Sequence, residues 1–137
     1  MNERFLLDTD ICSFIIKGTR PDLDIRLREL SPEQTLISAV TRAELRFGLA
    51  KRPNAIRLAG LVERFLQTVV TLPWDATAAD TYGQVRARLE KIGTPIGEHD
   101  TMIAAHALAT NLLLVTHNVE HFRRVEGLRW VTWNKLD

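Results

Sequence analysis

The 137 residues of this chain are enough for one domain with a buried core, so folding needs no disulfide or zinc framework. Lys and Arg number 18 against 17 Asp and Glu, and the net charge of +1 means that any electropositive surface must be local. With one cysteine, no signal-peptide pattern and no apolar run near the ~20 residues of a membrane span, we expect a soluble cytoplasmic protein.

Apolar runs alternate with segments of helical spacing along the chain. In order, they predict strand 4–8, helices 10–17 and 21–30, strand 34–38, helices 39–51 and 54–67, strand 69–72, helices 75–92 and 99–109, strand 112–116 and an edge strand 130–132. Strands separated by helices need crossover connections. We therefore expect an α/β fold with a central, mainly parallel sheet between two helix layers, as a single domain over residues 1–137.

Three acidic residues follow strands or open helices in this series. Asp8 ends the first strand, Glu44 lies in the helix after the second, and Asp100 opens the helix after a glycine-containing loop. In parallel sheets ligand sites form outside the carboxyl ends of the strands, where such residues meet. Because carboxylates repel one another, their assembly indicates a divalent cation.

Each acid also has a purely structural interpretation. Asp10 is a helix cap and Asp8 a turn residue; Asp100 stabilises a first helical turn. Glu44 completes a capping-box pattern with Thr41, although Ser38 is an equally good cap and would place Glu44 one to two turns into the helix.

Other polar residues are open to two interpretations as well. Seven basic residues near the acids belong equally well to the solvated faces of helices or to a local electropositive surface. They are Arg42, Arg46, Lys51, Arg52, Arg86, Arg88 and Lys91. Cys12 and His106 lie in apolar surroundings and are interpreted as packed residues, and no zinc pattern accompanies the histidines.

Four ordered strings carry a family resemblance. They are LLDTD (6–10), SAVTRAEL (38–45), PIGEHDTMIAAHA (95–107) and LVTHNVEHF (114–122). In that order they resemble the PIN-domain family, and within it the VapC toxins of bacterial toxin–antitoxin pairs. The ending GLRW (127–130) with Trp133 is similar to members that cut initiator tRNA.

The resemblance implies a PIN-like three-layer α/β/α domain and a metal-dependent endoribonuclease acting on RNA, with tRNA expected. Asp8, Glu44 and Asp100 match the acids that hold Mg²⁺ or Mn²⁺ in such proteins, and Thr9, Thr116 and Asn118 match residues that orient ligands or phosphate. It further implies a homodimer neutralised by a VapB-type antitoxin.

The sequence departs from the family pattern before Phe122. Many members carry an Asp there, whereas this chain has His121, with Glu120 one residue earlier. Either Glu120 supplies a fourth carboxylate through a shifted turn, or a second metal is weakly held.

Two other functions stay open at this point. Asp8 and Asp10 after an apolar strand also resemble the start of haloacid-dehalogenase-type phosphatases, whose later lysine and paired-acid motifs have no clear match here. A non-catalytic RNA- or protein-binding PIN domain is the second alternative, distinguished by the loss of acids that this chain keeps.

Overall fold

The centre of the molecule is a five-stranded sheet, seen in a computed structural model that describes residues 2–133. The strands are β1 (Phe5–Leu7), β2 (Thr35–Ser38), β3 (Val70–Leu72), β4 (Leu113–Val115) and β5 (Trp130–Val131). They lie in the order β3-β2-β1-β4-β5, and every neighbouring pair is parallel. All five predicted strands are present, and β5 is an edge strand as expected.

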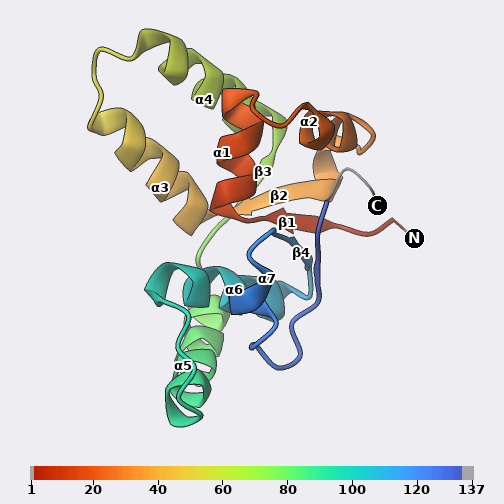
Figure 1. The fold of residues 1–137 in the computed structure, drawn as a ribbon, viewed down its shortest axis with the longest axis vertical. Helices are drawn as coiled ribbons and strands as arrows, with labels where there is room; N and C mark the ends of the chain where they lie inside the picture. Colours follow the sequence, from red (N-terminus) through yellow and green to blue (C-terminus); the bar gives the residue numbers. More distant parts are fainter. Residues whose placement is uncertain (1, 134–137) are drawn as a thin grey trace.

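Helices cover both faces of the sheet (Figure 1). One layer contains α1 (Thr9–Lys17), α2 (Pro21–Arg28) and α4 (Ile56–Thr68), with α3 (Ala39–Ala50) beside them. The other contains α5 (Ala76–Lys91), α6 (Glu98–Thr110) and α7 (Val119–Phe122). The three-layer prediction is confirmed. A 3-10 turn at Pro32–Gln34 and the short α7 were not predicted, because elements of three or four residues are too short to show a hydrophobic period.

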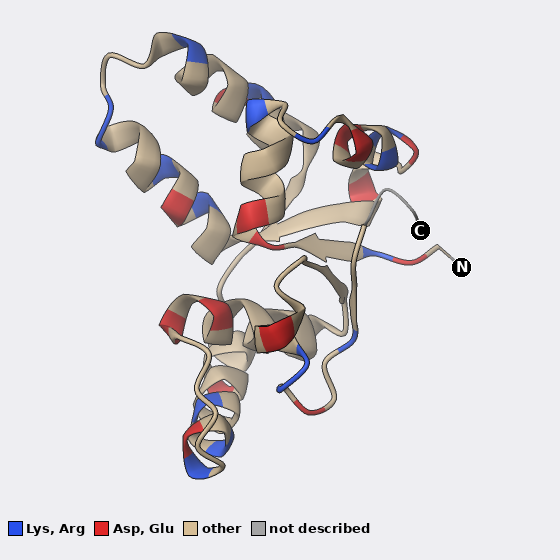
Figure 2. Ribbon diagram, viewed as in Figure 1, with Lys and Arg blue, Asp and Glu red and all other residues tan. Residues whose placement is uncertain are grey.

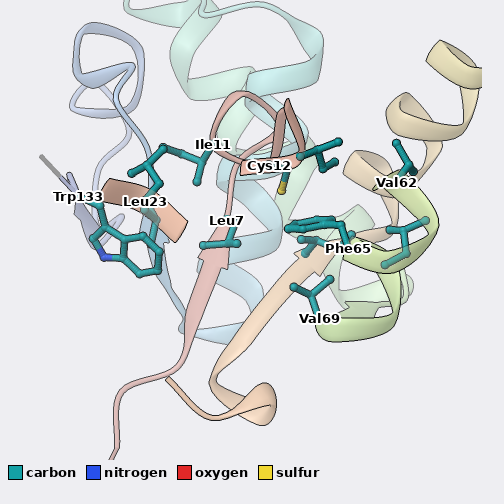
Figure 3. Packing of buried hydrophobic residues seen from close by; sticks show 12 residues of the cluster. Leu7, Ile11, Cys12, Leu23, Val62, Phe65, Val69 and Trp133 are labelled. Carbon is teal, nitrogen blue, oxygen red and sulfur yellow. The ribbon is translucent and has the colours of Figure 1, made fainter. Parts of the chain in front are cut away.

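Two apolar clusters lie against the two faces of the sheet. Successive strand residues point to opposite faces, so Leu6 enters one cluster and Leu7 the other. Figure 3 shows Leu7 packed with residues of α1 and α4, including the buried Phe65. On the opposite face Leu6 lies beside Leu36 and Leu114, its partners on β2 and β4. Both faces of the central strands are therefore buried, which explains their uninterrupted apolar sequences.

Several helix ends lie where the sequence predicted them. Ser38 caps α3 by accepting a hydrogen bond from the Val40 amide, Asp75 caps α5, and Asn111 ends α6 in the left-handed conformation. One assignment was wrong. Asp8 and not Asp10 caps α1, since the Asp8 carboxylate accepts from the Ile11 amide at 2.9 Å and the helix begins at Thr9.

Helices α3 and α4 form a pair that extends beyond the sheet, which we call the helical arm (residues 39–68; Figure 1). Both ends of the arm join the sheet, because α3 follows β2 at Ser38 and α4 leads into β3 through Val69. No helix in residues 2–133 has the length and apolar character required to cross a membrane.

Candidate metal centre

The topology provides a crevice between β1 and β4. The chain adds β2 and β3 on one side of β1 and then returns to place β4 and β5 on the other side. At such a switch point the connections leave the strand ends in opposite directions, and ligands bind between them. Asp8 follows β1 directly, and Thr116 follows β4. The Asp8 amide donates to the carbonyl of Val115 at 3.1 Å, which joins the two strand ends.

Asp8 is a buried carboxylate with little compensation for its charge. Its residue is 4% exposed, and burial raises its pKa from 3.8 to about 6. Hydrogen bonds from Thr116 and from the Ile11 amide oppose that rise, whereas the charges of Asp10 and Asp100 add to it. A second acid therefore approaches Asp8 closely enough to increase the cost of ionising it.

Asp100 is held by two side chains from the segment after β4. It lies in the first turn of α6, and its Oδ2 accepts from Asn118 Nδ2 at 3.1 Å. The same oxygen lies 2.8 Å from His121 Nδ1. The Asn118 backbone amide donates to Thr116 Oγ1 at 2.9 Å. Asp8 and Asp100 are thus connected through Thr116 and Asn118.

Glu44 belongs to a different environment. It lies exposed on α3, on the helical arm, just over one turn after its start. It lines a cavity of about 250 Å³ together with Thr9. Thr9 is the residue after Asp8, so this cavity opens beside the buried acids. Since Ser38 is the cap of α3, the capping-box interpretation of Glu44 is wrong.

A hydrogen-bond chain connects the arm to the rest of the site. Thr9 Oγ1 lies 3.0 Å from Thr41 Oγ1 on α3 and 2.8 Å from His99 Nε2 on α6. Thr9 was a predicted site residue, whereas Thr41 was considered only as a cap and His99 was not proposed. The sequence contains one signal for His99, its place directly before Asp100, and nothing that reveals its contact with Thr9 across 90 positions.

The two candidates near the family departure occupy different surroundings. The Glu120 side chain is 70% exposed and pairs with Arg123 at 3.3 Å. His121 contacts Asp100, and its ring also lies 3.0 Å from Asn118 Nδ2. The structure therefore places His121 beside Asp100, whereas Glu120 pairs with a basic residue just after α7.

These residues suit a hard divalent cation, although they do not form a complete cage. Within residues 2–133, no three His, Cys, Asp or Glu side chains converge closely enough to hold a metal ion. The available donors are carboxylate, hydroxyl and amide oxygens, which Mg²⁺ and Mn²⁺ prefer. A cation beside Asp8 would compensate the buried negative charge that raises its pKa.

The structure also shows the surroundings of the residues interpreted as packed and of the basic residues. Cys12 is fully buried, and burial raises the pKa of its thiol. His106 is 1% exposed and hydrogen-bonded to Ser38 Oγ at 2.7 Å, so both packing predictions are confirmed. Figure 2 shows the acidic segment of α3 between basic ones. Ion pairs engage Arg46 with Glu63, Arg86 with Glu90 and Arg88 with Glu126.

Comparisons with known proteins agree across nearly the whole length. The PIN domain family model matches residues 5–128. The tRNA(fMet)-specific endonuclease VapC of Shigella flexneri is 40% identical over 131 residues, covering 96% of this chain and 98% of that protein. In a structure of DNA-bound VapBC from Salmonella typhimurium, the matching chain has a TM-score of 0.89 at 37% identity, with coverage of 97% and 100%. In a structure of VapBC2 from Rickettsia felis bound to a promoter DNA fragment, the matching chain has a TM-score of 0.88 at 30% identity. The match covers 95% of this chain and 98% of that chain.

Proposed function

The chain belongs to the PIN-domain family, and we propose that it is a metal-dependent endoribonuclease toxin that hydrolyses phosphodiester bonds in tRNA. The observation that carries this proposal is the approach of Asp8 and Asp100 at the switch point of the sheet, where the charge of one raises the pKa of the other. Family membership leaves the haloacid-dehalogenase alternative without support. Retention of the acids argues against a PIN domain that only binds RNA or protein.

The site residues have distinct roles in this proposal. Asp8 and Asp100 supply fixed negative charge, and Glu44 adds a carboxylate from the arm. Thr116 orients Asp8, and Asn118 and His121 orient Asp100 through the contacts described above. Thr9 connects α1 with α3 and α6.

Mg²⁺ or Mn²⁺ is the proposed cation, held by Asp8 and Asp100 with Glu44. When bound, it would supply positive charge that activates water and neutralises charge developing on phosphate oxygens. The chain's own residues hold the carboxylates in place and keep Asp8 away from bulk solvent. Glu120 remains a candidate additional ligand, although its pairing with Arg123 favours His121 as the residue that acts on Asp100.

Substrate and partner follow from the relatives. The specificity of the Shigella relative for tRNA(fMet) supports initiator tRNA as the RNA. The VapBC complexes support a VapB-type antitoxin that neutralises the toxin, and we propose that the toxin acts as a homodimer. The single-domain assignment over residues 1–137 remains a proposal as well.

The test is incubation of purified, antitoxin-free protein with total RNA, with Mg²⁺ or with EDTA, followed by mapping of the new ends. We expect discrete cuts that require the metal and leave 5′-phosphate and 3′-hydroxyl ends, because water and not the ribose 2′-hydroxyl attacks phosphorus. Products ending in 2′,3′-cyclic phosphate, or equal cutting in EDTA, would contradict the proposed mechanism. Binding of RNA without any cutting would favour the non-catalytic alternative.

A further inference from the structure

Two cavities adjoin one another between α1 and the helical arm. The first, of about 250 Å³, is lined by Glu44 and Thr9 at its end nearest the candidate metal centre. The second, of about 630 Å³, lies around the turn between α3 and α4. Both are lined by Lys17, Arg52 and Leu58, so the two cavities share part of their wall. We call the two cavities together the arm groove.

Basic residues line the arm groove along its length. Lys17 and Arg52 line both cavities, Lys51 lines the first and Arg57 the second. All four residues are exposed. Glu44, at the metal-centre end, is the one acidic lining residue of either cavity among the described residues.

These four cations differ from most arginines elsewhere on the surface. In residues 2–133, no carboxylate forms an ion pair with any of them, whereas Arg46, Arg86 and Arg88 all have acidic partners. Lys51 instead places its ammonium 4.6 Å from the centre of the Phe47 ring, a cation–π contact with a neutral side chain. Four basic residues without ion-pair partners in residues 2–133 therefore lie together in this groove, on a chain whose net charge is only +1.

The groove begins at the site where a phosphodiester would be cut. Thr9 and Lys17 are the two ends of α1, and a rise of 1.5 Å per residue separates them by about 12 Å along the helix. A polyanion whose reacting phosphate lies beside Glu44 and Thr9 would thus continue past Lys17 and Arg52. Lys and Arg in such a channel neutralise backbone phosphates without reading sequence.

We propose that the arm groove binds the RNA backbone on one side of the cleaved bond, with Lys17, Lys51, Arg52 and Arg57 contacting its phosphates. This inference rests on the proposed ribonuclease function and specifies where its substrate runs. It assigns the helical arm a role in holding substrate as well as in carrying Glu44. A peptide segment of the antitoxin is the competing occupant, because apolar residues such as Leu58 and Val62 also line the groove.

The test measures RNA affinity in EDTA, where cleavage cannot interfere. Fluorescently labelled initiator tRNA is titrated with the parent protein and with the double variant Lys17→Gln/Arg52→Gln, at several salt concentrations. We expect at least about a tenfold loss of affinity near physiological salt. The slope of log affinity against log salt should become about 1.4 to 1.8 less negative, as for two lost phosphate contacts.

The matched control removes the same two charges elsewhere. Arg86 and Arg88 lie on α5 and are paired with Glu90 and Glu126, so in Arg86→Gln/Arg88→Gln the RNA affinity should change by less than about twofold. Thermal unfolding checks that both variants are folded, and Lys51→Gln/Arg57→Gln provides a second groove variant. Unchanged affinity and slope in the two groove variants, or equal losses in the control, would overturn the proposal.

Antitoxin binding by the same variants separates the competing occupant. Loss of antitoxin affinity with normal RNA binding would assign the groove to the antitoxin and overturn the RNA proposal. Because these titrations need no catalysis, failure of the ribonuclease function appears separately, as a parent protein that does not cut RNA when metal is added.

Discussion

The two halves of the candidate site are built in different ways. Asp8 and Asp100 lie at the ends of elements anchored to the sheet, and Thr116, Asn118 and His121 hold them. Glu44 lies exposed on the helical arm without an ion-pair partner in residues 2–133. The sheet therefore fixes one pair of carboxylates, at a cost in stability, while the third carboxylate lies on an exposed part of the helical arm.

The chain His99–Thr9–Thr41 is a hydrogen-bonded connection between these halves. It joins α6, α1 and α3. Changes to either half, or to this connection, should therefore have different consequences for activity and for stability.

Removing a charge from the sheet half should have the largest effect on activity. Asp8→Asn or Asp100→Asn should lower metal-dependent RNA cleavage at least about a thousandfold, since several kcal/mol of charge stabilisation depends on the cation. In metal-free buffer at pH 7, Asp8→Asn should melt at or above the parent temperature. The matched control is Asp10→Asn, an exposed neighbour whose cleavage rate should stay near that of the parent. A parental rate in Asp8→Asn would remove the carboxylate from the mechanism.

Removing the charge from the arm half should lower activity without changing stability. We expect Glu44→Gln to reduce cleavage by about 10- to 100-fold, on the scale of a lost ligand or supporting group. Its metal-free melting temperature should match the parent, because Glu44 is exposed. If Glu44→Gln stabilised the protein as much as Asp8→Asn, the contrast between the two halves would be lost.

His121 and Glu120 are adjacent residues whose substitution should have different effects on activity. His121→Ala removes a contact to Asp100 and should weaken metal-dependent activity by about tenfold. Glu120→Gln removes an exposed pair with Arg123 and should change activity less than about threefold. Cleavage assays titrated with Mn²⁺ compare the two variants, and the reverse ranking would identify Glu120 as the additional carboxylate.

The smallest effect is expected at the connection between the halves. Thr41→Val keeps the shape but removes the hydroxyl that meets Thr9, so cleavage should fall by a few-fold, consistent with the ~1 kcal/mol of an average hydrogen bond. Thr41→Ser keeps the hydroxyl and should restore most of the activity. Equal activity in the valine and serine variants would show that the chain does not help to position Glu44.

Local sequence signals were sufficient to predict the architecture of the sheet and its helices. The limits of strands and helices could be predicted from short apolar runs and from Ser38, Asp75 and Asn111, because burial and capping act over a few residues. The contacts of His99 with Thr9 and of His121 with Asp100 join residues 90 and 21 positions apart, and depend on how helices pack. The same holds for the arm groove, where Lys17 meets Arg52 only after α1 and α3 are placed.

Burial of Asp8 should make the free energy of unfolding depend on pH. A carboxyl whose folded pKa is raised from 3.8 to about 6 favours the folded state below pH 4. That contribution is lost as the pH rises through 6, by about 3 kcal/mol at neutral pH. A cation bound to the ionised carboxylate restores stability by mass action.

The most direct measurement is therefore the free energy of unfolding of the parent and of Asp8→Asn from pH 4 to 7, with and without Mn²⁺. Without metal, the parent should lose about 2 kcal/mol relative to the variant across this range, and Mn²⁺ at pH 7 should stabilise the parent alone. Equal stabilisation of both proteins by Mn²⁺, or the same pH profile for both, would show that Asp8 is not a buried carboxylate that holds the cation.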